Sequence, residues 1–497
     1  GEAVMVLDRR PGRVVSSAWR GLLAALPRGL YATLPGEGET LAVLQEGLAK
    51  PQPLGLDLEG ACTLVSFGAP VLEGWGRPGR MLAVRKGLRV VQLDTWRSPS
   101  AALADEWVAI APGGEGPLAL ALAGLVAREA SAGEDVRRSL AGVSLRELAP
   151  RTGLEPERIE ALARALARQA PTVAIGGGDP GAGPLSRDAE RAIALLNVAL
   201  GSVGREGGFV PRCPLPEAGS ETGAPSVRLE DVPAGSVGVL LLDAADDGRA
   251  LPAPLVRRVL ATGAVVVSLS PFDGALVREA DVLVPAPAPL EAWDEVLPTA
   301  DASVASYSVA APILAAPTGA TDTIAFVQSL AAALRVEVAP ATHEGRLRER
   351  AAAIHAAGRG RLVARADGGY AEAASTDPAA LWDALVAGGC WIDDVEPLRP
   401  LAVRPDLPTT ASLERWAGPE AAGSGLSLVS FAARGTAGTT PPSPLLTKLY
   451  QESDLRSGAA TAAISPATAG RLGLVDRQPV RVEGPGGAVR AEVRVDP

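Results

Sequence analysis

Lysine, histidine and cysteine are scarce in this sequence of 497 residues. Lys50, Lys86 and Lys448 are the only lysines, so arginine carries nearly all of the positive charge, as in proteins from genomes biased toward Arg, Ala, Gly and Pro codons. The two histidines, His343 and His355, lie near arginines, and we expect them to be solvated positions of one helix. A histidine-based catalytic site or metal cage is therefore not expected.

The three cysteines, Cys62, Cys213 and Cys390, lie far apart in the sequence. Three thiols cannot complete a four-cysteine iron–sulfur cluster, so neither such a cluster nor any metal-ligating set is predicted for this chain. Cys62 falls within the apolar run Ala61–Phe67, which favours a position in the core.

Long apolar runs are also missing. None reaches the ~18 residues that a membrane span needs, and Pro117–Ala127 is expected to be a buried helix. Residue 1 is glycine, and no signal peptide is visible. The formal net charge of −10 makes the chain a poor non-specific ligand for nucleic acid or an anionic membrane.

The sequence does contain regular alternation of short apolar runs with helical patterns. Hydrophobic residues are 47% and charged residues 21%, which is typical of a globular protein. Alternation of this kind favours parallel sheets of the doubly wound type. The predicted strands include Ala3–Leu7, Thr63–Phe67, Leu88–Asp94, Glu106–Ile110, Thr172–Ile175, Val237–Leu242, Val265–Leu269 and Asp281–Val284. The predicted helices include Ser17–Leu26, Pro117–Arg128, one opened by a capping box at Ser144–Glu147, Arg187–Leu200, Pro254–Ala261 and Glu344–Ala357.

Two segments of the chain match without a gap at a shift of 176 residues. Val90–Asp94 falls on Val266–Ser270, and the pair Ala104-Asp105 falls on Ala280-Asp281. This register predicts two similar α/β halves, although any two doubly wound units can align in this way. We expect residues 59–109 and 235–285 to superpose.

The predicted fold class is α/β, with two pseudo-repeated doubly wound parallel-sheet halves and a C-terminal β-barrel-like domain. The first half is placed at residues 1–135 and the second at 136–335. Residues 336–425 are weakly patterned and predicted to be a connector or covering segment. Residues 426–497 are predicted to form the small barrel, complete or incomplete, because Gly484–Gly487 joins two short β runs as a hairpin.

Four stretches of the chain resemble the large subunit of the molybdopterin oxidoreductase, or dimethyl sulfoxide reductase, superfamily. They follow the family's order and span most of the sequence. They are LRVVQLDTWRSPSAALADEWVAIAPGGEG (Leu88–Gly116), IALLNVALGSVGREGG (Ile193–Gly208), ADVLVPAPAPLEAW (Ala280–Trp293) and SPATAGRLGLVDRQPVRV (Ser465–Val482).

This resemblance implies that each α/β half holds one pterin guanine dinucleotide, with molybdenum or tungsten between them. Residue types of the family's dinucleotide site persist in the first half, and a triple glycine could also approach a ligand, although a plain strand-to-helix turn explains it equally well. The residues concerned, if a dinucleotide is retained, are Gly68, Asp94, Arg97, Ser98, Gly176, Gly177 and Gly178.

Three departures from the family's pattern argue against a bound cofactor. The family's iron–sulfur domain has no counterpart in this sequence, and the loop Thr33–Gly47, which should supply the metal ligand, contains no Cys or Ser. The turn after the second-half strand carries Asp243, Asp246 and Asp247. A carboxylate ~5 Å from a phosphate charge costs roughly 3 kcal/mol at an effective dielectric constant of about 20.

Within the superfamily, SFGAPVLEGWGRPGR (Ser66–Arg80) and SPLLTKLYQESDLR (Ser443–Arg456) resemble one branch, the molybdopterin-like subunits of menaquinone reductase complexes and of alternative complex III. That resemblance implies a cofactor-free scaffold subunit of a quinone-linked electron-transfer complex. Its partners would be an iron–sulfur subunit, a multihaem cytochrome c subunit and an integral-membrane quinone-binding subunit. It would be periplasmic and peripheral to the cytoplasmic membrane, and no catalytic residue is predicted. The alternative is an active oxidoreductase that binds molybdenum or tungsten bis(molybdopterin guanine dinucleotide).

Overall fold

The structure, a computed structural model, divides the chain into two compact units, Gly1–Thr439 and Thr440–Pro497. Gly178, Asp246, Asp247 and the stretch Ser443–Arg456 lie outside the described residues. The structure describes residues 2–34, 36–129, 133–177, 185–217, 223–243, 253–271, 280–338, 341–366, 369–373, 376–394, 401, 403, 426–429, 460–484 and 487–495.

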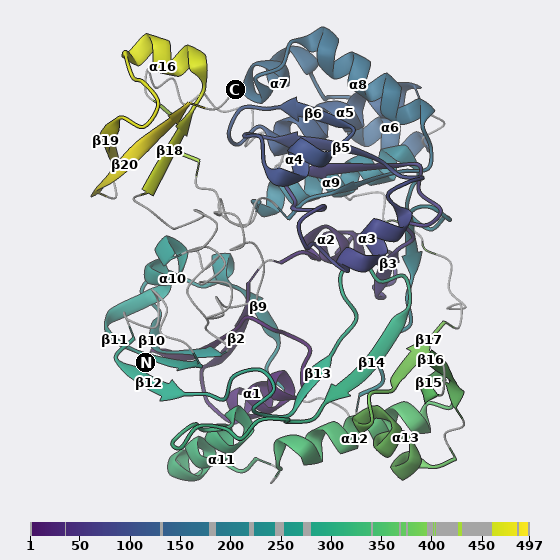
Figure 1. The fold of residues 1–497 in the computed structure, drawn as a ribbon, viewed down its shortest axis with the longest axis vertical. Helices are drawn as coiled ribbons and strands as arrows, with labels where there is room; N and C mark the ends of the chain where they lie inside the picture. The colour runs from purple at the N-terminus through teal and green to yellow at the C-terminus, as the bar shows by residue number, and fades with distance from the viewer. Residues whose placement is uncertain are drawn as a thin grey trace. The chain divides into compact units, whose positions relative to one another are not determined.

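A six-stranded parallel sheet contains both the start and the middle of the chain (Figure 1). The N-terminal strand pairs directly with a strand more than 200 residues later, Val6 lying opposite Leu241. In spatial order the strands are β12 (Val282–Pro285), β11 (Leu260–Ser270), β10 (Val237–Asp243), β1 (Ala3–Asp8), β2 (Gly29–Thr33) and β9 (Ser226–Arg228).

A four-stranded parallel sheet forms from the segment between those two regions. Its strands, in spatial order, are β6 (Glu106–Ala109), β5 (Arg89–Asp94), β4 (Thr63–Phe67) and β7 (Thr172–Ile175). The predicted boundary at residue 135 is therefore wrong as a division between sheets. Strands β1 and β2 join the later sheet, whereas β7 joins the earlier one, because strand pairing here is non-local.

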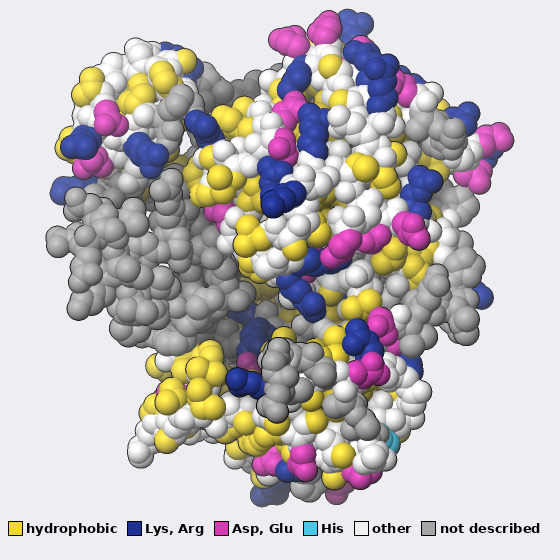
Figure 2. Space-filling view, turned by 45° about the vertical axis from the view of Figure 1, so that its right-hand side comes forward, with side chains coloured by type: hydrophobic (Ala, Val, Ile, Leu, Met, Phe, Trp, Pro, Cys, Tyr) yellow, Lys and Arg dark blue, Asp and Glu magenta, His cyan; other side chains and the backbone are white. Residues whose placement is uncertain are grey.

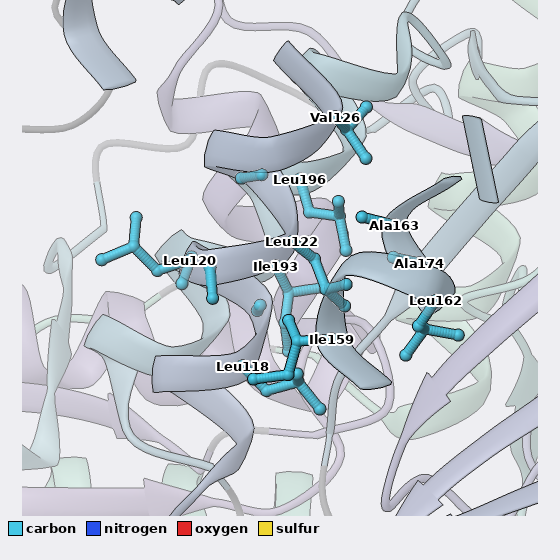
Figure 3. Packing of buried hydrophobic residues seen from close by; sticks show 14 of the residues in the cluster. Leu118, Leu120, Leu122, Val126, Ile159, Leu162, Ala163, Ala174, Ile193 and Leu196 are labelled. Carbon is cyan, nitrogen blue, oxygen red and sulfur yellow. The ribbon is translucent and has the colours of Figure 1, made fainter. Parts of the chain in front are cut away.

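Helices cover both faces of the four-stranded sheet. One face carries the largest core, in which α5 (Glu115–Glu129), α7 (Leu145–Thr152), α8 (Pro156–Arg168) and α9 (Arg187–Leu200) bury leucine, isoleucine and alanine side chains (Figure 3). The opposite face packs on α2 (Glu39–Glu46), α3 (Pro78–Val84) and the antiparallel pair β3 (Leu54–Leu56) and β8 (Phe209–Pro211). Short helices α4 (Pro99–Leu103) and α6 (Glu134–Leu140) complete this part.

Other helices bury the two faces of the six-stranded sheet. Helix α1 (Val14–Ala24) and α11 (Thr323–Leu334) cover one face, and α10 (Ala253–Val259) with the short 3-10 helix Leu229–Asp231 covers the other. None of the helices in the described ranges is long and apolar enough to cross a membrane. The protein is thus a mixed α/β fold with parallel sheets.

The 176-residue shift recurs in the pairing of the strands. Asp105 bonds across to Val90, whose N–H donates to its carboxylate at 2.7 Å, and Asp281 does the same with Val266 at 2.8 Å. Strands β4–β5–β6 and β10–β11–β12 share their spatial order and their register. The corresponding pairs are Val65–Val91 and Leu241–Val267, then Val91–Glu106 and Val267–Val282. A gene duplication would explain this shared register, but the duplication itself stays a prediction.

The region predicted to be a connector forms part of an antiparallel sheet instead. Short strands separated by turns carry too little periodicity to be recognised in the sequence. In spatial order the strands are β13 (Asp294–Val296), β14 (Ala305–Ala310), β17 (Cys390–Asp393), β15 (Arg361–Ala366) and β16 (Gly369–Ala373). Helices α12 (His343–Ala356) and α13 (Pro378–Val386) pack against it.

The described part of the C-terminal unit is a three-stranded sheet with one helix. Strand β20 (Gly487–Val495) pairs parallel with β18 (Ala460–Ile464) and antiparallel with β19 (Pro479–Gly484), as the predicted hairpin requires. Helix α16 (Pro466–Leu472) ends at Gly473, whose φ is 65°. Closure into a barrel stays a prediction.

Three local expectations are wrong. Cys62 is exposed, because β4 begins at the next residue and leaves its side chain at the end of the strand. His343 is not solvated: its Nδ1 lies 2.8 Å from Asp322 Oδ2, and the ring is largely buried. The Ser144 hydroxyl makes no capping hydrogen bond, although Ser144 does precede α7.

Asn197 closes the open edge of the four-stranded sheet. Strand β7 is an edge strand, and the Asn197 side chain accepts from Ala174 N at 2.8 Å and donates to Ala174 O at 2.8 Å. Unpaired, these buried backbone groups would be costly. Asn197→Leu should therefore lower the free energy of unfolding by about 2–3 kcal/mol in denaturant titration. Arg146→Ala, on an exposed face of α7, should change it by less than about 0.5 kcal/mol, and equal effects would contradict this role.

Candidate functional site

Each parallel sheet has one place where strand order reverses, and ligands of doubly wound folds bind outside the carboxyl ends of the strands at such a place. In the four-stranded sheet this is the adjacent ends of β4 and β7, followed by Gly68 and Gly176. We call it the first switch point. In the six-stranded sheet it is the ends of β1 and β10, Asp8 and Asp243, which we call the second switch point.

The backbone donors of the first switch point are bonded to the chain's own side chains. Gly177 N donates to Glu190 Oε1 at 2.6 Å, and Gly176 N donates to Thr40 Oγ1 at 2.8 Å. The Thr40 hydroxyl in turn donates to Glu190 Oε2 at 2.7 Å. Glu190 is 0% exposed and Thr40 1%, so this network is closed to solvent.

The two glycines of this turn are required for different reasons. Gly177 has a φ of +106°, a conformation that L side chains rarely adopt. A Cβ on Gly176 would collide with the Glu190 carboxylate. Burial raises the pKa of Glu190 to about 7, and the hydrogen bonds from Thr40 and Gly177 oppose that rise.

The second switch point holds a buried cluster of two carboxylates and one arginine. Arg13 Nη2 lies 2.9 Å from Asp243 Oδ2 and 3.3 Å from Asp8 Oδ1, and all three residues are buried. Asp8 also accepts from the hydroxyls of Ser16 at 2.6 Å and Tyr31 at 2.7 Å. Burial raises the pKa of Asp243 to about 6 although Arg13 opposes the rise. The predicted negative charge of Asp243 is therefore countered inside the protein by Arg13.

A third carboxylate occupies the start of the helix that follows β1. Glu295 Oε1 accepts from Val14 N, the first residue of α1, at 2.5 Å. Glu295 Oε2 accepts from Arg350 Nη1 at 2.6 Å, and both residues are buried. A helix N-terminus favours an anion, and here a carboxylate of β13 supplies it.

The residues predicted for the first half form a local turn at the end of β5. Asp94 accepts from the Ser98 hydroxyl at 2.8 Å and from Thr95 N at 2.8 Å. Arg97 is exposed and forms no ion pair or hydrogen bond within the described part of the chain. Gly68, with a φ of +75°, donates its N–H to Leu93 O and directs the chain away from β4. Gly178, Asp246 and Asp247 are not described, so their roles stay predictions.

Several polar side chains of the loop Thr33–Gly47 bond other parts of the chain. Besides Thr40, Glu39 and Glu46 pair with Arg228 of β9 at 2.8 and 3.3 Å. Glu37 accepts from Gly76 N at 3.0 Å. Over the described ranges no group of three His, Cys, Asp or Glu side chains could hold a metal ion.

Sequence reasoning missed Glu190, Arg13 and Glu295. Glu190 had a detectable signal, because it continues the buried stripe of Ile193 and Asn197 on α9 at helical spacing. A charged residue on a buried stripe must find donors. Glu295 had none, since its partners lie about 280 residues before it and 55 after it.

No family model matches the chain. The menaquinone reductase molybdopterin-binding-like subunit of Nitratidesulfovibrio vulgaris is 26% identical over 493 residues, which covers 94% of this chain and 67% of that protein. The molybdopterin-containing subunit of thiosulfate reductase from Salmonella typhimurium is 28% identical over 261 residues, covering 48% of this chain and 32% of that protein. Acetylene hydratase from Pelobacter acetylenicus superposes with a TM-score of 0.60 at 14% identity, covering 99% of this chain and 77% of that one, and shows the fold alone.

Arg13 should be essential to the stability of the second switch point. Removing it leaves Asp8 and Asp243 buried without a counter-charge, so Arg13→Ala should cost about 3–5 kcal/mol of unfolding free energy at pH 7. Arg10→Ala removes an arginine of the same turn that pairs with Asp294 at the surface, and should cost less than about 1 kcal/mol. Chemical denaturation of both variants measures the difference. If both variants lose the same free energy of unfolding, the buried cluster of Arg13, Asp8 and Asp243 contributes no more to stability than the surface pair of Arg10 and Asp294.

Glu190 should make stability depend on pH in a definite direction. Its pKa of about 7 in the folded chain exceeds that of an unfolded glutamate, about 4.3, so the folded state binds more protons between these values. The free energy of unfolding should therefore fall as the pH rises from about 4.5 to 7. Glu190→Gln should remove the part of this decrease in unfolding free energy that Glu190 causes, whereas Glu157→Gln, at an exposed position, should leave the decrease unchanged. Superimposable pH profiles of wild type and Glu190→Gln would contradict the assignment.

Proposed function

We propose that this chain, which belongs to the molybdopterin oxidoreductase superfamily, is a cofactor-free scaffold subunit of a membrane-associated, quinone-linked electron-transfer complex. One observation carries the proposal. At both switch points the groups that would hold a ligand's phosphates are bonded to buried carboxylates of the chain itself, namely Glu190, Asp8 with Asp243, and Glu295.

The residues present do not fit molybdenum bis(molybdopterin guanine dinucleotide). Its diphosphates need backbone N–H groups and cations. Here the N–H of Gly177 and the guanidinium of Arg13 already bind carboxylates. The only buried hydroxyl of α2, on Thr40, bonds Glu190 and Gly176, so it is not free as a metal ligand. No reaction step is therefore assigned to this cofactor.

Similarity to a menaquinone reductase subunit supports membership of a multi-subunit complex. The partners we propose are an iron–sulfur subunit, a multihaem cytochrome c subunit and an integral-membrane quinone-binding subunit. The proposed location is the periplasm, at the surface of the cytoplasmic membrane. On the face shown in Figure 2, basic and acidic side chains are interspersed, which does not suit a nucleic-acid partner.

A second candidate is an active molybdenum or tungsten oxidoreductase. Exposed Arg97 favours it, because this cation near the end of β5 remains available for a phosphate. The arrangement at Gly177 and Arg13 opposes it, since the enzyme would need both dinucleotides.

Metal and pterin content distinguish the two candidates. The chain purified with its native partners should contain less than about 0.1 molybdenum or tungsten per chain by elemental analysis. It should release no fluorescent pterin on acid treatment, because Gly177 N and Arg13 already bind carboxylates of the chain. A superfamily enzyme purified from the same cells is the positive control. Near one metal and two pterins per chain would overturn the proposal in favour of the enzyme.

A further inference from the structure

Glu190 is a buried carboxylate without a salt-bridge partner among the described residues. It is 0% exposed and bonds two neutral donors, Gly177 N and the Thr40 hydroxyl. A lone carboxylate in an apolar site costs several kcal/mol unless hydrogen bonds replace its hydration. An apolar residue, like Ile193 and Ala194 at helical spacing from it, would avoid the cost. The turn thus gives this buried carboxyl group two hydrogen-bond donors and no counter-charge among the described residues.

The donors around this carboxylate have the character of an oxyanion site. A backbone N–H and a hydroxyl point at its two oxygens, and Gly176 leaves the space that a Cβ would fill. Gly176 N adds a third donor behind the first two, because it holds the Thr40 hydroxyl in place at 2.8 Å. Glycine N–H groups at a strand–helix turn are what phosphates and sulfates bind in other proteins.

We propose that the Glu190 carboxylate is a built-in anion that closes a latent oxyanion site made by Gly176, Gly177 and Thr40. Removing the carboxylate converts this turn into a binding site for inorganic phosphate or a phosphate ester. The inference goes beyond the proposed function, because it concerns a site in this chain alone and holds whatever complex the chain joins.

At the second switch point, too, a buried carboxylate accepts a hydrogen bond from a backbone N–H at a strand–helix turn. At the N-terminus of α1, Glu295 accepts from Val14 N, and Arg350 binds its other oxygen. Strand β1, which precedes α1, flanks β10 in the six-stranded sheet, just as β7 flanks β4 in the four-stranded one. The strand–helix turns at corresponding places in both sheets therefore end in a buried carboxylate of the chain.

The test compares the full-length wild type, Glu190→Ala and the matched control Glu190→Gln, in which the amide keeps the space filled. Each protein is refolded and melted in 0–50 mM inorganic phosphate, with ionic strength held constant by chloride. Because bound ligand stabilises the folded state, phosphate should raise the Tm of Glu190→Ala by about 1–2 °C at tenfold the dissociation constant. It should leave wild type and Glu190→Gln within about 0.5 °C.

Equal responses of the three proteins to phosphate would overturn the proposal. If Glu190→Ala folds only when phosphate is present, the rescue supports it. If it folds in neither buffer, Glu190→Ser, whose hydroxyl can donate to the incoming anion, is taken through the same series. Failure of phosphate to rescue or stabilise both variants would also overturn it. Pterin and metal content play no part in these readouts, so the outcome is independent of the proposed function.

Discussion

A carboxylate buried at the turn between a parallel strand and its helix is the interaction on which this structure depends. Glu190 lies on α9 and bonds Gly177, just after β7, and Thr40 of α2. It thereby joins α2 to the β7–α9 turn, about 150 residues later in the sequence. In a dinucleotide-binding protein the ligand's phosphates would make the connections that this side chain makes here. Here a side chain of the protein, rather than a ligand, links these elements.

The second switch point obeys the same constraint with different groups. Asp8, Asp243 and Arg13 satisfy one another where β1 and β10 end, and Glu295 supplies the anion at the start of α1. At each switch point, described groups that could bind phosphate are therefore bonded to carboxylates, Gly177 N in one sheet and Arg13 with Val14 N in the other. If only one turn were closed, a single dinucleotide could still bind at the other sheet, so the proposal of a cofactor-free subunit rests on carboxylates at both turns.

Local features of the fold were predictable from the sequence, and non-local ones were not. The helix Arg187–Leu200 has the predicted bounds because Ser186 caps its start and Gly201, with a φ of 67°, ends it. The pairing of β1 with β10 left no local pattern, so the boundary at residue 135 was misplaced. The same distinction between local and non-local features holds for the site. The glycine turn was predictable from the sequence, but the partners of Glu190 and Glu295 depend on contacts that form only in the folded chain.

A cryo-electron microscopy map of the native complex, with side chains resolved at the switch points, tests the central claim most directly. The predicted map has the Glu190 carboxylate within hydrogen-bonding distance of Gly177 N and the Thr40 hydroxyl, and Arg13 between Asp8 and Asp243. Density for a pterin dinucleotide at either turn, with Glu190 or Arg13 displaced toward it, would contradict the claim.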